Sequence, residues 1–198
     1  RPGRVEWCAA TLGRLLHASG ARHVRLSVEW DQVEPQEGRF DFPKADVSIQ
    51  RIVMTIRLDC PPGGCDPWDR SASVFVRGWN PAGKTDQFEI ARFITPYGVG
   101  CSWEVDVTDY RIFLTGNASL GFFVDTFIGG NRGWLVTLSF DFYPGRAQRK
   151  VISVENLWRG KPEFGNPAGP IDQFFTPRTV AIDPSATAVT LRFLVTGH

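Results

Sequence analysis

The sequence predicts an all-β protein, an antiparallel sandwich of the jelly-roll type. Short segments in which apolar and polar residues alternate recur at intervals of about ten residues, as strands of a sandwich do. The 20 glycines and 14 prolines of the chain, together with asparagines, fall largely between these segments, where sharp turns are needed. No crossover of helix length separates the segments, which argues against a parallel α/β sheet.

The first elements are a helix and a strand. Leucines at helical spacing predict one short helix over Thr11–Ser19, closed by Gly20. Strict alternation then predicts a strand over Val24–Trp30. The strands predicted after it are Ile52–Leu58, Val74–Val76, Phe88–Ile94, Trp103–Val107, Leu120–Thr126 and Trp134–Phe142.

A polar break at 144–149 indicates a domain boundary. Beyond it we expect strands at Val151–Leu157, Val180–Ile182 and Val189–Val195, with a Gly- and Pro-rich loop before the last two. So few strands cannot close a second sandwich, and they would leave exposed sheet edges. We therefore expect either that they complete the first domain or that a partner chain supplies the remaining strands.

Charge and hydropathy exclude several classes of function. Lys and Arg number 22 against 21 Asp and Glu, so no basic field favours nucleic acid and no basic stripe favours an anionic membrane. No apolar run is long enough to span a bilayer. The first residues do not have the pattern of a signal peptide, so a secreted protein would be present here in its mature form.

The segment from Cys60 to Arg70 carries the clearest chemical pattern. A small Cys-to-Cys loop ends in Trp68, Asp69 and Arg70, just before an alternating strand. The positive charge of Arg70 would keep the carboxylate of Asp69 ionised. The indole of Trp68 would offer a flat face to a pyranose ring. The alternative is a tight hairpin with an exposed ion pair.

An ordered series of motifs resembles the N-terminal jelly roll of the peptide N-glycosidase F family, bacterial amidases that remove asparagine-linked glycans. The motifs are Cys-Pro-x-x-x-Cys-Asp-x-Trp-Asp-Arg at 60–70, Arg92–Gly100, Glu104–Tyr110, Leu114–Asn117 and Val124–Thr126. The resemblance implies an N-terminal extension at 1–36, a jelly-roll domain at 37–145, and the first strands of a second, incomplete jelly roll at 150–198.

The resemblance also implies an active site between two jelly rolls with three acidic positions. Asp69 matches the first, and Asp125 stands where the family has a glutamate. The third belongs to a Cys-rich motif of the second domain that this chain does not contain. Phe127 replaces a tryptophan of the family, and Gly98 replaces an aromatic residue.

The implied reaction is hydrolysis of the amide between asparagine and the innermost N-acetylglucosamine of an N-glycan. Asp69 and Asp125 are the catalytic residues that the resemblance implies. The substrate-binding residues implied are Trp68, Arg70, Phe127 and His198. No metal or organic cofactor is implied. The partners are an N-glycoprotein or glycopeptide and a second chain that completes the second jelly roll, in a secreted or periplasmic setting.

Four cysteines allow three pairings. Cys60 and Cys65 lie close enough in sequence to staple their loop, and this is the pairing that we expect. Cys8 and Cys101 could then pair, which the sequence leaves open. The cysteines lack paired C-x-x-C spacing, so a zinc site is not favoured.

Other functions remain open at this point. A non-catalytic jelly roll that binds glycan or glycopeptide is the main alternative, since the shorter Asp125 and the missing motif both weaken the case for catalysis. A protein-interaction module rests on fold analogy alone. The segment Val24–Phe42 is similar to part of barrel glycosidases, but their barrel takes about 250 residues with alternating helices.

Overall fold

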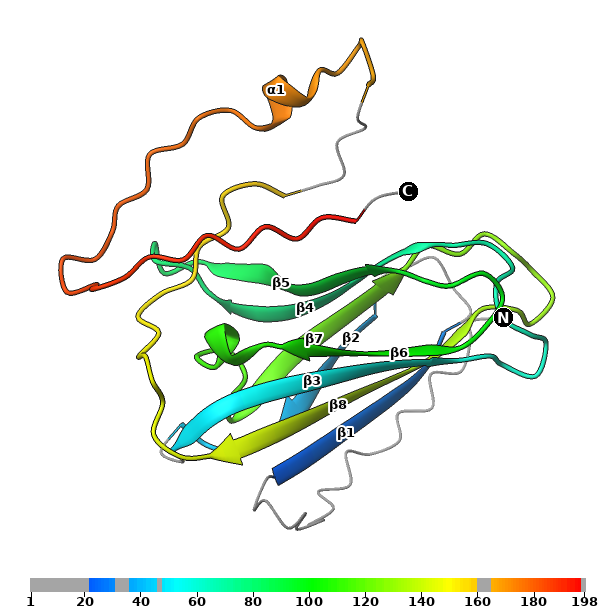
Figure 1. Cartoon of the computed structure of the whole chain (residues 1–198), viewed down its shortest axis with the longest axis horizontal. Helices are drawn as coiled ribbons and strands as arrows, with labels where there is room; N and C mark the ends of the chain where they lie inside the picture. Colours follow the sequence, from blue (N-terminus) through cyan, green and yellow to red (C-terminus); the bar gives the residue numbers. More distant parts are fainter. Residues whose placement is uncertain (1–21, 31–35, 46–47, 160–164, 197–198) are drawn as a thin grey trace.

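A computed structural model of the chain describes residues 22–30, 36–45, 48–159 and 165–196, and it forms a sandwich of two antiparallel four-stranded sheets (Figure 1). The first sheet has the order β1 (Arg22–Trp30), β8 (Trp134–Pro144), β3 (Ile49–Asp59) and β6 (Cys101–Asp106). The second has the order β2 (Gln36–Asp41), β7 (Asn117–Val124), β4 (Ser71–Trp79) and β5 (Thr85–Ile94). The chain therefore changes sheets repeatedly, which confirms the predicted jelly-roll sandwich.

Alternation along the strands builds the core. In β3, residues 52, 54, 56 and 58 are buried between the sheets, because successive side chains of a strand point to opposite faces. Aromatic rings fill much of the space between the sheets, with Phe42 edge-on to Phe140 at 5.1 Å and Phe88 stacked on Phe113 at 4.4 Å. The loops at both ends of the sandwich therefore begin and end on strands that contribute to this core.

The strands before residue 145 follow the sequence prediction closely, with one addition at the N-terminal side. Each predicted strand lies within or overlaps an observed one, whereas β2 was missed because its six residues are mostly polar. β1 lies inside the segment that was predicted to be an N-terminal extension. It pairs with β8 in antiparallel fashion, with Arg22 opposite Phe142 at one end and Trp30 opposite Trp134 at the other. The helix predicted at 11–19 falls outside the described residues, and the domain boundaries stay a prediction.

The C-terminal segment does not contain the strands expected from its sequence. Among the residues described after β8, the structure has a single helical turn, α1 (Ile171–Phe174), and no strand. The chain at 189–195 is extended, but a strand also needs a neighbour to pair with, and no described strand lies in register beside it. Its apolar residues Val189, Leu191, Phe193 and Val195 are exposed.

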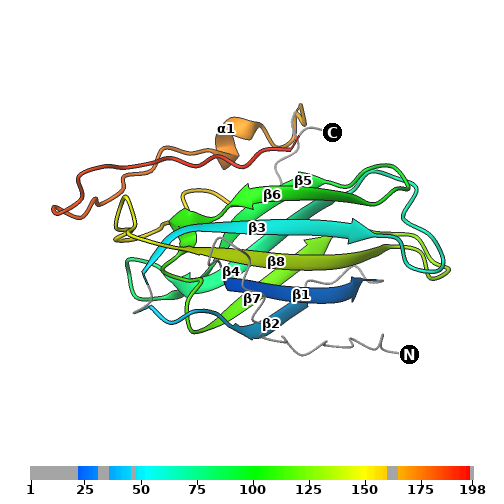
Figure 2. The same cartoon turned by 60° about the horizontal axis from the view of Figure 1, so that its bottom comes forward.

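Polar contacts join this segment to the sandwich along the side formed by β5 and β6 (Figure 2). Asn156 donates to the backbone carbonyl of Gln87 at 2.9 Å, and Arg159 forms an ion pair with Asp86. Farther on, Arg192 lies 3.3 Å from a carboxylate oxygen of Asp109. The segment therefore runs over one edge of the sandwich, and the contacts at Asp86 and Asp109 lie towards the end that carries the β4–β5 hairpin.

The two ends of the sandwich differ in how they are built. The loops β3–β4, β5–β6 and β7–β8 meet at one end, on the right in Figure 1, and we call it the loop end. The opposite end carries the β4–β5 hairpin and the short 3-10 helix Thr108–Tyr110. Residues 60–70 and 125–127, which the sequence singled out, all lie at the loop end.

Candidate functional site

A disulfide between Cys60 and Cys65 closes the β3–β4 loop, as the sequence predicted. The closed loop rests on the β7–β8 loop through backbone contacts. Gly133 donates its N–H to the carbonyl of Gly64 at 3.2 Å, and Asp66 donates its N–H to the carbonyl of Gly133 at 3.3 Å. The approach is close enough that a Cβ on Gly63 would lie 2.2 Å from the backbone oxygen of Asn131. Only glycine fits at this position without a shift of one loop.

Asp66 occupies the centre of the loop end, with no solvent exposure. Its Oδ1 accepts hydrogen bonds from the backbone N–H of Trp68 at 3.0 Å and from Nη2 of Arg70 at 3.3 Å. Its Oδ2 accepts from Nε of Arg70 at 2.8 Å and from the hydroxyl of Thr126 at 2.8 Å. Both carboxylate oxygens are therefore fully engaged by donors from two loops.

The hydrogen bonds decide the protonation state of Asp66. Burial by itself would raise the pKa of this carboxyl, because it disfavours the charged form. The hydrogen bonds from Arg70, Trp68 and Thr126 and the charge of Arg70 outweigh burial and hold the pKa below its ordinary value. Asp66 is therefore a carboxylate at neutral pH despite its burial.

Arg70 thus binds Asp66, whereas the sequence analysis expected it to hold Asp69. The reason is geometric, since neighbouring residues of an extended chain point in opposite directions. The side chain of Arg70 turns towards the interior of the loop end, where the disulfide loop places Asp66. Sequence reasoning missed Asp66, although an acid four residues before the arginine in the same motif was the available signal.

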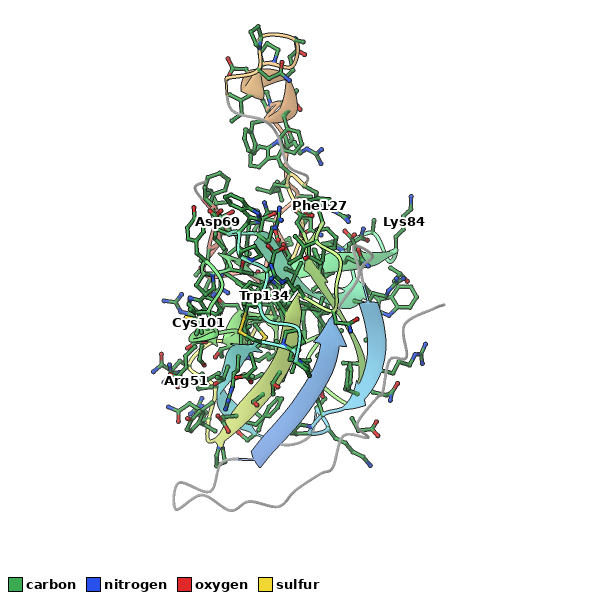
Figure 3. The ribbon with its side chains drawn as sticks, turned by 90° about the vertical axis from the view of Figure 1, so that its right-hand side faces the viewer. Arg51, Asp69, Lys84, Cys101, Phe127 and Trp134 are labelled. Atoms are coloured by element: carbon green, nitrogen blue, oxygen red, sulfur yellow. A yellow bond between two sulfur atoms is a disulfide. The ribbon has the colours of Figure 1, made fainter. Side chains whose placement is uncertain are left out.

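Aromatic side chains are exposed around this buried pair. The guanidinium carbon of Arg70 lies 5.2 Å from the centre of the Phe127 ring, and that side chain is 70% exposed. Trp68 and Tyr97 are also exposed, at 59% and 63%. Figure 3 looks at the sandwich from the loop end and labels Asp69 and Phe127 there. Flat, exposed rings beside charged groups are suited to binding sugar rings, which present both apolar faces and hydroxyl groups.

Asp69 lies at the edge of this aromatic group. A hydrogen bond with Asp69, and then the negative charge of its carboxylate, raise the pKa of the Tyr97 phenol. Tyr97 belongs to the β5–β6 loop, so this contact joins that loop to the predicted catalytic residue. The backbone of the same loop approaches at Gly98, which takes a positive φ of 63° and donates its N–H to the carbonyl of Asp66 at 3.0 Å.

Asp125 comes directly after β7, beside the first residue of β4. The hydroxyl of Ser71 donates to Oδ2 of Asp125 at 2.7 Å, and the backbone N–H of Asp125 donates to the carbonyl of Ser71 at 3.0 Å. Since Ser71 is two residues after Asp69, the two predicted catalytic acids come from adjacent strand ends. Of the predicted site residues, Trp68, Asp69, Arg70, Asp125 and Phe127 lie at the loop end, and His198 is outside the described residues.

Within the described ranges, no group of three or more His, Cys, Asp or Glu is arranged to hold a metal ion. In the same ranges, no helix has the length and apolar character required to cross a membrane. Within the described residues the half-buried Cys101 forms no disulfide, and Cys8, with which it could pair, lies outside them. The pairing of these two cysteines therefore stays open.

No protein-family profile matches the chain. Over 123 residues, or 60% of its length, the chain is 37% identical to a peptide-N(4)-(N-acetyl-beta-D-glucosaminyl)asparagine amidase F from Elizabethkingia miricola. The predicted resemblance to the peptide N-glycosidase F family is confirmed. The crystal structure of a peptide-N(4)-(N-acetyl-beta-D-glucosaminyl)asparagine amidase matches 64% of this chain with a TM-score of 0.53 and 33% identity. PNGase F from Flavobacterium meningosepticum, described as a glycosylasparaginase, matches the same share with a TM-score of 0.52 and 33% identity.

The relatives are longer than the part that is matched. The chain matches 33% of the length of the curated relative, and 44% and 43% of the two structures. The chain therefore spans less than half the length of these relatives, and the activity of a whole enzyme is a matter for proposal.

Proposed function

We propose that the protein is a peptide-N-glycosidase, which hydrolyses the amide between asparagine and the innermost N-acetylglucosamine of an N-glycan. The observation that carries this proposal is the arrangement at the loop end. There Asp69 lies against exposed Tyr97, next to exposed Trp68, and beside the ion pair of Arg70 with Asp66. The similarity to amidases over 60% of the chain supports the assignment.

In this proposal Asp69 acts as the general base or orienting group for water. The water oxygen adds to the carbonyl carbon of the asparagine side chain while its proton passes to the carboxylate. The bond from that carbon to nitrogen then breaks, and the nitrogen takes up a proton and leaves on the sugar as a glycosylamine. The asparagine becomes aspartate.

The remaining groups bind and orient the substrate. Trp68 and Phe127 pack against the sugar rings, because exposed aromatic faces favour contact with the apolar faces of a pyranose. Arg70 donates to a substrate oxygen by a charge-assisted hydrogen bond. Asp125 orders the polar network next to Asp69 through its contact with Ser71.

We propose further that a second polypeptide segment completes the active site. The exposed apolar row Val189, Leu191, Phe193 and Val195 supports this, since such a row is suited to pairing with a further strand. The segment would supply the third acid, and His198 would bind substrate near the junction. The Cys60–Cys65 disulfide supports a secreted or periplasmic location, where disulfides persist.

Product analysis tests the proposed reaction. The native protein is incubated with an N-glycopeptide, and both products are identified by mass spectrometry. We expect aspartate at the former glycosylation site and a released glycan that retains its innermost N-acetylglucosamine. Cleavage between two sugars, with a sugar left on asparagine, would contradict an amidase.

A non-catalytic glycan-binding module is the second candidate. Asp125, which is one methylene shorter than the glutamate at the matching family position and accepts the Ser71 hydroxyl, favours it. Calorimetry with the same glycopeptide separates the two candidates. If the glycopeptide binds at the loop end but neither the aspartate-containing peptide nor the released glycan is formed, the result would support the binding module over the enzyme.

A further inference from the structure

Asp66 contacts all three loops of the loop end. Its own loop provides the Trp68 N–H and the Arg70 guanidinium, and the β7–β8 loop provides the Thr126 hydroxyl. Its backbone carbonyl accepts the N–H of Gly98 from the β5–β6 loop. Burying a carboxylate is costly unless it is paired and hydrogen-bonded, so this position requires its whole set of donors. One fully buried residue thus joins the three loops, two through its side chain and the third through its backbone carbonyl.

The arrangement also fixes Arg70. Its Nε and Nη2 donate to the two oxygens of Asp66, which is a bidentate geometry with a defined plane. Its backbone is fixed as well, since its N–H donates to the hydroxyl of Thr95 at 2.8 Å and its carbonyl accepts the N–H of Thr95 at 2.8 Å. Among the described residues, Nη1 has no hydrogen-bond partner, and the guanidinium lies against the exposed ring of Phe127.

We propose that Asp66 is a positioning residue, which holds Arg70 against Phe127 so that Nη1 faces the oxygen of the scissile amide. This rests on the proposed function. Asp66 is fully buried and touches no substrate in this account, so it acts through Arg70. The oxygen gains negative charge when water adds to the carbonyl, and a donor fixed in advance stabilises that charge. A freely rotating arginine would lose this advantage.

A double-mutant cycle tests the coupling between the two residues. Asp66→Asn removes the charge and keeps the size, Arg70→Met removes the guanidinium, and the double variant combines them. We expect Asp66→Asn to lower kcat by about ten- to a hundredfold with little change in KM, because a misplaced group weakens the transition state more than binding. The double variant should be no less active than Arg70→Met. Losses that multiply would overturn the proposal, since Asp66 would then act independently of Arg70.

The matched control is Asp106→Asn at the opposite end of the sandwich. Asp106 also accepts a hydrogen bond from the Nε of an arginine, Arg51, at 2.9 Å, but it is half exposed and far along the chain from the loop end. Its kcat should stay within about twofold of the native value, as expected for an exposed ion pair. A loss as large as that of Asp66→Asn would show that general destabilisation explains both variants.

A spectroscopic readout is independent of activity. In the native protein, we expect the Nε–H and Nη signals of Arg70 to be resolved and slow to exchange in nitrogen-15 NMR, with assignment by their loss in Arg70→Met. In Asp66→Asn they should average, and in Asp106→Asn they should persist. A rapidly averaged Arg70 in the native protein would overturn the proposal, even if Asp66→Asn does not fold. A fixed Arg70 together with no amidase activity would instead contradict the proposed function and leave the positioning intact.

Discussion

The two ends of the sandwich each carry an ion pair between an arginine and an aspartate, and the pairs differ in burial. At the loop end, the side chains of Asp66 and Arg70 are 0% and 16% exposed. At the opposite end, those of Asp106 and Arg51 are 47% and 57% exposed. An exposed ion pair contributes about 0–1 kcal/mol to the free energy of unfolding. Losing one partner of a buried pair leaves the other partner buried without an opposite charge or a hydrogen bond, which is strongly destabilising. The same two residue types therefore tolerate change where the pair is exposed and set the geometry where it is buried.

The comparison extends to the backbone. At the loop end, Gly63 meets the backbone of Asn131, so two loops are in direct main-chain contact. At the opposite end, Gly78 faces the side-chain ring of Phe113. Main-chain contact leaves less room for adjustment than a side chain does. A rigid set of loops is suited to holding a reacting carboxylate, and the predictions that follow test this difference between the ends.

The largest effect is expected for Asp69→Asn, which keeps the size of the side chain and removes its basic oxygen. Glycan release from a glycopeptide should fall by at least about a hundredfold, the usual contribution of a general base. Circular dichroism should show an unchanged fold. Asp109→Asn at the opposite end is the control and should retain activity. Near-native release by Asp69→Asn would remove the catalytic assignment.

A clash between loops should follow from Gly63→Ala. The added methyl group would lie 2.2 Å from the oxygen of Asn131, so one loop has to move. We expect a loss of about 1–3 kcal/mol in the free energy of unfolding, typical of overpacking, together with lower activity. Gly129→Ala in the β7–β8 loop is the matched control, since its new methyl group would meet no atom within 4 Å. Equal effects in the two variants would contradict tight docking of the loops.

Replacing both Cys60 and Cys65 by serine should lower the free energy of unfolding by about 2 kcal/mol, the chain-entropy value for so short a loop. Chemical denaturation of the native and variant proteins measures it. Because Asp66 directly follows Cys65, we also expect reduced activity in the folded variant. Peptide mapping without reducing agent should find the two cysteines linked, and free thiols at both positions would contradict the structure and the proposed extracytoplasmic location.

The smallest effect is expected for Asp106→Asn, at most about 1 kcal/mol at neutral pH. Both aspartates contribute to stability in acid. Burial by itself would raise the pKa of Asp106, but its hydrogen bonds with Thr108 and Arg51 outweigh burial and lower the pKa, so the direction is the same as for Asp66. The folded-state pKa of Asp66 lies below the ordinary value, so its contribution to stability is present above the unfolded pKa of about 3.9 and is lost as the pH falls through the folded pKa. Because Asp66 is fully buried and Asp106 is half exposed, Asp66→Asn should flatten the acid dependence of the unfolding free energy more than Asp106→Asn does. The reverse order would contradict the difference in burial.

Much of the sandwich was predictable from the sequence, because strands with one buried face carry a strict alternation. β3 and β8 show it plainly. β2 was missed since its short, polar sequence becomes a strand only through pairing with β7. At 189–195 apolar and polar residues do alternate, and the sequence therefore predicted a strand. A strand also requires a neighbouring strand to pair with, and the local sequence does not reveal whether one is present. The domain boundaries and the roles of the site residues stay predictions.

The site was only partly predictable for a related reason. The motif at 60–70 identified Trp68, Asp69 and Arg70 and the disulfide, because these depend on residues near one another in the chain. The partner of Arg70 depends on which way each side chain turns after the loop closes. The contact of Asp66 with Thr126 joins residues 60 positions apart, and no local pattern could indicate it.

Titration of the isotope-labelled protein with an N-glycopeptide, followed by amide NMR, tests the central claim most directly. The claim is that the loop end binds the substrate and the opposite end does not. We expect shifts that saturate at residues of the β3–β4, β5–β6 and β7–β8 loops, Asp69, Gly98 and Phe127 among them, with Asp106 and Asp109 unchanged. Shifts centred on the opposite end, or none at a saturating concentration of glycopeptide, would contradict the account.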